Sequence, residues 1–482
     1  MSVELKLGAI SAADLSLFTR GKLLCYGNYN EKTSVTGCSI DSREVESGDL
    51  FVAIPGERAD GHDYIKGAIE RGAVAVLAEK MPESPKSLGK NYCLILVENT
   101  VRALGDIANE YKKRLVHKCI AVTGSVGKTT TKEFIASVLS ERFKVHKTVG
   151  NYNNELGLPL TLLALEPDTQ IAVLEMGMSG FGEIERLSKI AEPDVGIITN
   201  IGSSHMENLG SRENICSAKM EIVLGMKSGG ELVLCADEPL LFLLHRSDYN
   251  PTYVSVYNRA AEFRAVNIRY GQMKTTFDLL YNRRALTNIE VPALGLHNVY
   301  SALFAYAVGA KFGMKDEDIR RGLLKYKAVE MRQNIYNIGD ITVIDDCYNA
   351  SPESMRAAID VLCELSRQKG GARKVALLGD MRELGADTRL IHEQLGVYVA
   401  QKQIDCLFTY GVAAENIAHS AIKNGLRAEN VYANVDVTNP LLSGEMLLEV
   451  LQPGDILLVK ASRAMAAEKI INYIKENMTR QD

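Results

Sequence analysis

Residues 118–134 read KCIAVTGSVGKTTTKEF, and this stretch decides how the chain folds. Its first part, residues 119–123, is a largely apolar run of the kind found in a buried strand. A turn bracketed by glycines follows, and across residues 129–142 apolar and charged side chains recur with a helical period. The order strand, loop, helix predicts a parallel α/β architecture with a binding loop at the end of the strand.

The loop between this strand and helix suits a nucleoside triphosphate. We expect the backbone N–H groups of residues 124–128 to face phosphate oxygens, because unpaired donors and the helix dipole favour anions there. Lys128 would neutralise the β and γ phosphates, and the Thr129 hydroxyl would lie on Mg²⁺. The spacing is GxxGKTT, since the first glycine of the usual GxxxxGKT would fall at Val122. The plain alternative is a glycine turn capped by threonines.

Length, charge and cysteine content limit the possible classes. A chain of 482 residues is too long for one core and favours three domains. The net charge is −5 and no basic block occurs, so nothing indicates a nucleic-acid partner. Nine scattered cysteines without a CxxC pair fit a reducing cytosol. The N-terminus lacks signal-peptide features and no apolar run approaches the ~18 residues of a membrane span, so we expect a cytoplasmic protein.

Short apolar runs that alternate with helical stretches predict an α/β fold of three domains. Residues 1–98 read as a small N-terminal α/β domain. Residues 99–328 read as a central P-loop domain with a doubly wound sheet, and its further strands are IAVLEM, VGIITN and ELVLCA. Residues 329–482 read as a Rossmann-like parallel sheet with five strands, ITVIDD, KVALLGD, DCLFTYG, NVYAN and DILLVKAS. Ligands of such sheets bind at the carboxyl ends of the strands.

Three residues of the central domain satisfy this rule and could hold a metal ion. Glu175 ends IAVLEM, His205 lies in the loop after VGIITN, and Thr129 follows the first strand. Together they could supply Mg²⁺ ligands around the γ-phosphate, although histidine is an uncommon partner for Mg²⁺. Glu175 as an ordinary loop carboxylate and His205 as a structural histidine remain the alternatives.

Lys219 is unusual because it falls on the apolar face of the helical stretch ENICSAKMEIVLGM. The alternative is a snorkelling lysine whose ammonium group stays in water. A buried lysine would instead be neutral or modified.

In the last domain, polar residues end three strands. Asp345 and Asp346 could hold a ribose or a cation, or one of them could cap the turn. Ser351 is expected as a helix N-cap, with Pro352 as the first helical residue. The other strand-end residues of this predicted polar cleft are Asp380, Lys460, Ser462 and Arg463.

These motifs, in this order, resemble those of the Mur ligases over nearly the whole chain. They are DSREVESGDLFVAIPGERADGHDY, TGSVGKTTTKE, GNYNNELGLP, LEMG, NIGSSH, SAKMEI, GLHNVYSAL, DDCYNASPESM, LGDMRELG and DILLVKASR. The set looks most like the branch that adds D-Ala-D-Ala to a UDP-linked muramoyl tripeptide in peptidoglycan precursor synthesis. The resemblance implies that ATP phosphorylates the tripeptide carboxylate, the dipeptide amine attacks the acyl phosphate, and phosphate leaves. It implies ATP and Mg²⁺ as cofactors and small-molecule substrates, and we expect a monomer without a membrane span.

The resemblance also implies roles for individual residues. Lys128, Lys219 and His205 would be catalytic, with Lys219 carbamylated. Thr129, Glu175, His205 and the carbamate would bind metal. ATP would contact Gly124, Ser125, Val126, Gly127, Lys128, Thr129, Thr130, Asn298, Arg332, Asp346, Tyr348 and Asn349. Ser42 and Arg43 would contact the uridine nucleotide, Asn153 and Asn154 the substrate, and Asp380, Lys460 and Ser462 the incoming dipeptide.

Two positions depart from the family pattern, and two other classes stay open. Val126 stands where many relatives carry asparagine, and Ala461 where glycine is frequent. One alternative is another member of the superfamily, such as the ligase that adds the third residue or a folate polyglutamate synthase. The other is a P-loop switch or motor, although the sequence has no NKxD motif and no LSGGQ-like signature.

Overall fold

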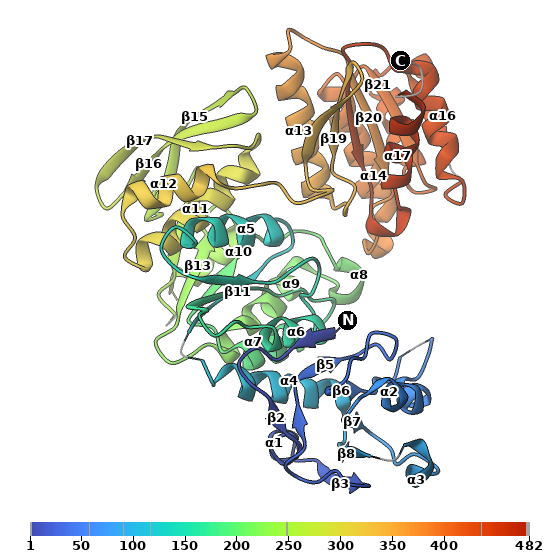
Figure 1. Cartoon of the computed structure of the whole chain (residues 1–482). Coiled ribbons are helices and arrows are strands. Elements are labelled where there is room, and N and C mark those ends of the chain that lie inside the picture. The colour runs from blue at the N-terminus through green and yellow to red at the C-terminus, as the bar shows by residue number, and fades with distance from the viewer. Residues whose placement is uncertain are drawn as a thin grey trace. The chain divides into compact units, whose positions relative to one another are not determined.

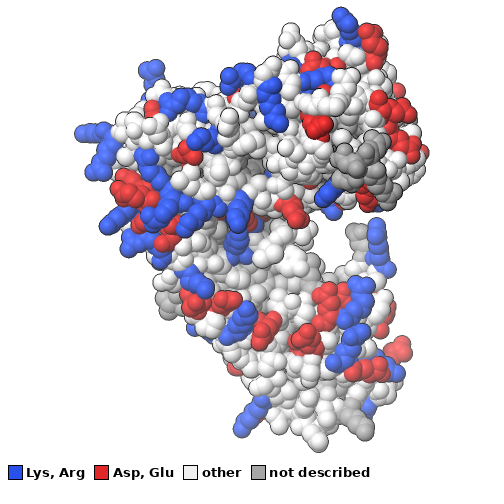
Figure 2. Space-filling view, turned by 45° about the horizontal axis from the view of Figure 1, so that its top comes forward, with Lys and Arg blue, Asp and Glu red and all other residues white. Residues whose placement is uncertain are grey.

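A computed structural model describes residues 2–56, 58–89, 91–115, 117–246, 249–434 and 436–478 (Figure 1). Its main sheets follow one another along the chain, and each is accompanied by helices, as the α/β prediction requires. Within these ranges, no helix is long and apolar enough to cross a bilayer. Figure 2 shows Lys and Arg side chains lying among Asp and Glu side chains over one face, which therefore carries both signs of charge.

The N-terminal sheet has six strands in the order β1-β5-β6-β7-β8-β3. Strands β5 to β8 pair in parallel, and β1 and β3 are antiparallel edge strands. A core that includes Phe51, Val76 and Leu94 lies on one face. The strands are β1 (Ser2–Glu4), β3 (Lys22–Tyr26), β5 (Gly37–Ser39), β6 (Asp49–Val52), β7 (Ala75–Ala78) and β8 (Tyr92–Leu96), and the helices are α1 (Ala12–Thr19), α2 (Ile65–Arg71) and α3 (Pro85–Leu88). A two-stranded ribbon pairs β2 (Ile10–Ser11) with β4 (Ser34–Val35).

The central sheet has nine strands in the order β10-β11-β9-β12-β13-β14-β15-β16-β17. The four strands predicted here are confirmed as β9 (Lys118–Thr123), β11 (Ile171–Glu175), β12 (Val195–Ile198) and β13 (Glu231–Cys235). The other strands were not predicted; they are β10 (Val145–Lys147), β14 (Thr252–Ser255), β15 (Phe263–Gly271), β16 (Lys274–Tyr281) and β17 (Arg284–Val291). Because β15, β16 and β17 form an antiparallel meander, the doubly wound pattern does not extend through this part.

Helices precede, connect and follow the strands of the central sheet. They are α4 (Thr100–Lys112), α5 (Lys128–Leu139), α6 (Gly157–Leu163), α7 (Glu183–Ala191), α8 (Met206–Leu209), α9 (Arg212–Met220), α10 (Pro239–Phe242), α11 (Leu296–Lys311) and α12 (Asp316–Leu324). Helix α11 is buried along most of its length, and it packs against α5 through a contact of 3.1 Å between the Ser301 and Thr131 hydroxyls. This packing fixes the helix that follows the phosphate-loop candidate.

The C-terminal sheet has the order β18-β19-β23-β20-β21-β22. Its five predicted strands are confirmed as β19 (Ile341–Asp345), β20 (Lys374–Gly379), β21 (Cys406–Tyr410), β22 (Val431–Asn434) and β23 (Ile456–Lys460), and the antiparallel edge strand β18 (Asn334–Ile338) is additional. One face packs against α13 (Pro352–Gln368), α14 (Thr388–Gln401) and α15 (Glu415–Lys423), and the other against α16 (Pro440–Val450) and α17 (Glu468–Met478) (Figure 1). Ser351 caps α13 and Pro352 is its first residue, as predicted.

Candidate active site

The loop of residues 124–127 joins β9 to α5, and two glycines determine its shape. Gly127 is the N-cap residue of α5 and has a φ of 81°. It has no side chain that could cap the helix, and a Cβ there would meet no atom within 4 Å. Gly124 has a φ of 147°, and a Cβ at this position would collide with the Thr199 hydroxyl. The first N–H groups of a helix have no partner within the helix. The start of α5 therefore has open space beside Gly127, and the positive end of the helix dipole favours an anion there.

Several groups of this loop have partners inside the protein. The Ser125 N–H donates to the Asn200 carbonyl oxygen at 3.2 Å, and the Val126 N–H donates to Asn200 Oδ1 at 2.9 Å. The Lys128 ammonium donates to the Gly124 carbonyl oxygen at 2.7 Å. The expectation that all amides of residues 124–128 face phosphate therefore does not hold for Ser125 and Val126, because Asn200 takes both N–H groups.

A buried polar atom next to the loop fits a bound nucleotide and metal ion. Thr123, the last residue of β9, has a buried hydroxyl oxygen that finds no hydrogen-bond partner in the described part of the chain. Such orphaned atoms are rare in folded proteins and mark places where a water, ion or ligand belongs. The residues present therefore fit the group that the sequence predicted.

Glu175 ends β11 in parallel register with Val122 of β9, next to the strand that leads into the loop. Its carboxylate is buried and accepts a 2.8 Å hydrogen bond from Asn153 Nδ2. Its own N–H donates to the Thr148 hydroxyl at 3.0 Å. Asn153 thus orients the carboxylate, whereas Asn154 accepts from two backbone N–H groups at the start of α6 and shapes that turn.

His205 is the N-cap residue of α8 and has a φ of 66°, an uncommon conformation for a residue with a side chain. Its Nδ1 lies 2.5 Å from Glu383 Oε2, in an orientation that does not satisfy hydrogen-bond geometry. Glu383 itself has a φ of 65°. Non-glycine residues held in this conformation cluster at functional sites. Among the described residues, no group of three or more His, Cys, Asp and Glu side chains is placed to hold a metal ion.

Lys219 is fully buried on α9, with 1% of the side chain exposed, so the snorkelling alternative is wrong. Burial, with a smaller effect of the charge on Lys128, lowers the pKa of Lys219 well below its ordinary value. In the ranges that the structure covers, no carboxylate forms an ion pair with it. Lys132 is buried to the same degree, but its ammonium lies 3.0 Å from the Glu133 carboxylate.

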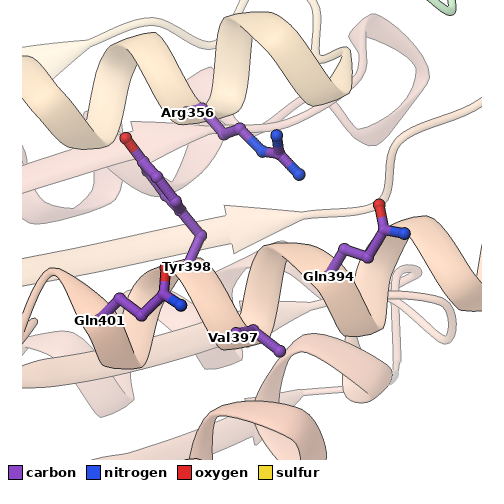
Figure 3. A pocket seen from close by; sticks show the side chains of 5 residues that line it. All are labelled: Arg356, Gln394, Val397, Tyr398 and Gln401. Carbon is purple, nitrogen blue, oxygen red and sulfur yellow. The ribbon is translucent and has the colours of Figure 1, made fainter.

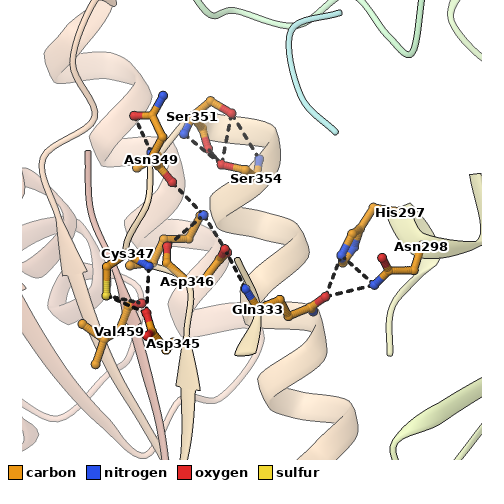
Figure 4. Close-up of polar contacts among 12 residues, drawn as sticks. His297, Asn298, Gln333, Asp345, Asp346, Cys347, Asn349, Ser351, Ser354 and Val459 are labelled. Atoms are coloured by element: carbon orange, nitrogen blue, oxygen red, sulfur yellow. Dashed lines mark hydrogen bonds and ion pairs between the residues drawn. The ribbon is translucent and has the colours of Figure 1, made fainter. Parts of the chain in front are cut away.

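A hydrogen-bonded chain connects four of the predicted site residues (Figure 4). Asn298, at the start of α11, donates at 3.0 Å to Gln333 Oε1, and the Gln333 N–H donates at 3.1 Å to Asp346 Oδ1. Lys460 then donates at 2.6 Å to Asp346 Oδ2 and at 2.9 Å to the Asn349 carbonyl oxygen. Lys460, expected at the dipeptide site, thus lies with the predicted ATP-contacting residues. Arg332 stacks over the Tyr348 ring at 4.0 Å from its centroid.

Asp380 and Ser462 are bound within the C-terminal sheet. Asp380 Oδ1 accepts from the Ala414 N–H at 2.7 Å, and the Ser462 hydroxyl accepts from the Arg382 N–H at 3.0 Å. Both side chains are buried. Their bonds fix loops at the ends of β20 and β23. Ala461 fits there because Gly379 opposite has no side chain: a Cβ on Gly379 would lie only 2.5 Å from that of Ala461.

In the N-terminal domain, Arg43 folds back onto Asp41 through two hydrogen bonds of 2.9 and 2.6 Å. Its side chain is 83% exposed, so the guanidinium faces solvent. Ser42 lies between these two residues and is half-buried. The DSR motif is therefore a surface turn with a cation that a ligand can reach.

A hollow of about 270 Å³ lies on the C-terminal domain, between α13 and α14 (Figure 3). It is lined by Arg356, Gln394, Val397, Tyr398 and Gln401. None of the site residues predicted from the sequence lines it, so this hollow does not bear on the predicted chemistry.

Sequence reasoning missed three residues that organise the site. Asn200 follows β12 by two residues, and the strand-end rule could have found it. Glu383 lies in a motif that was recognised, GDMRELG, but its contact with His205 joins distant loops. No pattern in the sequence marks Gln333. In the structure its φ is 53°, and its Nε2 is buried without a hydrogen-bond partner among the described residues.

Three family models match the chain in sequence order. "Mur ligase family, catalytic domain" matches residues 34–112, "Mur ligase middle domain" matches 122–309, and "Mur ligase, glutamate ligase domain" matches 331–463. A curated relative from Bacillus subtilis (strain 168), UDP-N-acetylmuramoyl-tripeptide--D-alanyl-D-alanine ligase, is 39% identical over 93% of this chain and 94% of its own length.

Solved structures are similar as well. The crystal structure I of MurF from Acinetobacter baumannii has a TM-score of 0.87 and 30% identity, and covers 98% of this chain and 100% of that one. The MurF ligase from Thermotoga maritima, in complex with ADP, has a TM-score of 0.80 and 30% identity, and covers 92% of this chain and 98% of that one.

Proposed function

This chain belongs to the Mur ligase family, and from that premise we propose that it joins D-alanyl-D-alanine to a UDP-N-acetylmuramoyl tripeptide at the expense of ATP. The reaction makes a peptide bond and releases ADP and phosphate, in the synthesis of a peptidoglycan precursor. The observation that carries the proposal is the similarity, over almost the full length, to a relative named for this reaction. The open N-terminus of α5 supports the ATP step.

The chemistry follows from the poor reactivity of a carboxylate. Transfer of the γ-phosphoryl group to the tripeptide carboxylate turns one oxygen into a good leaving group, and the dipeptide amine then attacks the carbonyl carbon. Both partners of the first step are anions, so the site must offset their repulsion. Lys128 supplies a positive charge at the loop, and the N-terminal end of the α5 dipole favours anions. The dipeptide amine must be uncharged when it attacks, so a base takes its ammonium proton first, and the nitrogen loses a second proton as the peptide bond forms.

We propose Thr129, Glu175, His205 and a carbamate on Lys219 as the residues that hold Mg²⁺. When bound, the metal would offset the charge of the phosphates. Thr129 is buried on α5, and Glu175 is oriented by Asn153. Among the described residues no carboxylate pairs with the buried Lys219, and burial favours its neutral amine. This amine would add to carbon dioxide and lose a proton, which gives an anionic carbamate ligand.

We also propose a role for each of the three parts of the chain. Residues 1–98 would bind the UDP moiety through Ser42 and Arg43. Residues 99–328 would bind ATP at the loop and at Asn298. Residues 329–482 would bind the incoming dipeptide near Asp380 and Ser462, and part of ATP near Arg332, Asp346, Tyr348 and Asn349. Two observations support this assignment of roles. Each part has its own main sheet, and Lys460 donates hydrogen bonds to both Asp346 and Asn349.

We also propose that the enzyme is a cytoplasmic monomer. All nine cysteines lie in the described ranges and none of them forms a disulfide, as a reducing compartment favours. ATP and UDP-linked substrates are found in the cytoplasm as well.

A phosphate-release assay across a panel of acceptors and amines tests the function. We expect release from ATP only with UDP-muramoyl tripeptide and D-Ala-D-Ala together, and none when Mg²⁺ is left out. Release with the UDP-muramoyl dipeptide and a diamino acid would indicate the third-residue ligase instead, and release with a folate and glutamate would indicate a polyglutamate synthase. Hydrolysis that needs neither acceptor nor amine would favour a switch or motor.

A further inference from the structure

Two cysteines of the N-terminal domain face each other across β3 and β8. Cys25 and Cys93 are directly opposite in the antiparallel register, and their sulfur atoms are 2.8 Å apart. A disulfide bond measures about 2.0 Å. Within the ranges that the structure describes, no second pair of cysteine sulfurs makes such a contact. The pair is therefore distinct from the seven other cysteines.

The backbone geometry of this pair suits a disulfide. The Cys93 N–H donates to the Val74 carbonyl oxygen at 2.9 Å, on the β7 side of β8. Since the N–H and C=O of one strand residue point to the same side, Cys93 makes no ladder bond with β3. Cys25 and Cys93 thus form a non-hydrogen-bonded pair, for which Cα atoms are about 4.5 Å apart and side chains are close. That separation lies within the range seen for disulfides, about 4.4–6.8 Å.

The two strands are held in this register from the other face of the sheet. The next cross-strand pair, Tyr26 and Tyr92, stacks with ring centroids 4.8 Å apart and an angle of 18° between the planes. Because β3 is an edge strand with a neighbour on one side only, a covalent link to β8 would restrain it strongly. The loop closed by such a link would span 68 residues.

The two thiols differ in access. Cys25 is exposed, whereas Cys93 is buried and donates to the Asn30 carbonyl oxygen at 3.5 Å. Burial, followed by the hydrogen bond with Cys25, raises the pKa of Cys93. Cys25 is therefore the thiol that meets an external reagent first, and Cys93 is the resolving thiol.

We propose that Cys25 and Cys93 form a reversible disulfide on exposure to a low-molecular-weight disulfide such as oxidised glutathione. The Cys25 thiolate attacks one sulfur of the oxidant, forms a mixed disulfide and releases one thiol. Cys93 then gives up its proton and attacks Cys25 Sγ, which releases the second thiol. Two protein thiols are oxidised and one external disulfide is reduced to two thiols. The product staples the edge strand β3 to β8.

The test is a redox titration of the folded full-length protein in glutathione buffers, with peptide mapping after thiol blocking. We expect a single linked pair of peptides, carrying Cys25 and Cys93, in oxidising buffer, and its loss in excess reduced glutathione. Hydrogen exchange of the β3 amides should slow at least several-fold in the oxidised form. No linked pair in the most oxidising buffer, or linkage spread over other cysteines of the folded protein, would overturn the proposal.

Two variants sharpen this test. Cys25→Ser removes one exposed thiol and should abolish the linked peptides, while glutathione adducts at Cys93 stay low because that thiol is buried. Cys363→Ser is the matched control, since Cys363 is half-buried in α13 and its sulfur contacts the Lys402 carbonyl oxygen at 3.8 Å. This variant should form the link as the natural chain does. The readout is covalent, so it is independent of whether the proposed ligase activity is found.

Discussion

Replacing Lys128 with alanine is expected to lower the rate of phosphate release by about 1,000-fold, the range found when one charge-stabilising group is removed from a transition state. The reason is electrostatic. Two anions must meet for the phosphoryl transfer, and the Lys128 ammonium lies at the loop, 2.7 Å from the Gly124 carbonyl oxygen. The rate is measured with saturating ATP, UDP-muramoyl tripeptide and D-Ala-D-Ala.

The control for this variant is Lys189→Ala. Lys189 is an exposed lysine of α7 that pairs with Glu185 at 2.6 Å, and its removal should leave the rate unchanged. Both variants are compared with the natural chain in thermal unfolding, so that a folding defect is recognised. A folded Lys128→Ala protein with a normal rate would remove the loop from the mechanism.

The second large effect is expected for Lys219→Ala, with a loss of about 100-fold, as for other groups that tune a metal site. Part of the activity should return when short carboxylic acids such as acetate or propionate are added. The alanine would leave a space beside the proposed metal site, and a small carboxylate would enter it and replace the proposed carbamate. Rescue is measured as a rate that rises with acid concentration and saturates.

Two comparisons test whether loss of a carbamate on Lys219 explains the rescue. Lys128→Ala should show no rescue, because its missing group is a cation. Isotope-labelled carbon dioxide should label Lys219 and not Lys132, which is buried to the same degree but already pairs with Glu133. An active enzyme whose Lys219 is unmodified would contradict the carbamate.

The sequence predicted the elements whose signals are local. The strand and helix around the phosphate loop follow from periodicity and two glycines, and α13 follows from the Ser351 cap and Pro352. The meander of β15 to β17 was missed because its strands, exposed along much of one face, lack the continuous apolar runs of a parallel sheet. The N-terminal edge strand β3 pairs with β8 across 68 residues, a distance over which a local pattern carries no information.

The candidate site was predicted as residue types at strand ends, but not as contacts. The apolar pattern around Lys219 correctly indicated the face on which it lies, whereas its complete burial depends on packing from distant segments. Asn200, Gln333 and Glu383 act through single hydrogen bonds or close contacts between loops. Such contacts depend on tertiary structure, so the sequence could at most place Asn200 at a strand end and could not show which groups these three residues contact.

In the proposed reaction, the tripeptide carboxylate becomes an acyl phosphate before the peptide bond forms. The most direct measurement uses tripeptide substrate with isotope-labelled oxygen in its terminal carboxylate and follows the label by mass spectrometry of the released phosphate. If an acyl phosphate forms, each phosphate released with product carries one labelled oxygen atom. Phosphate without label, at a normal rate of peptide-bond formation, would contradict it.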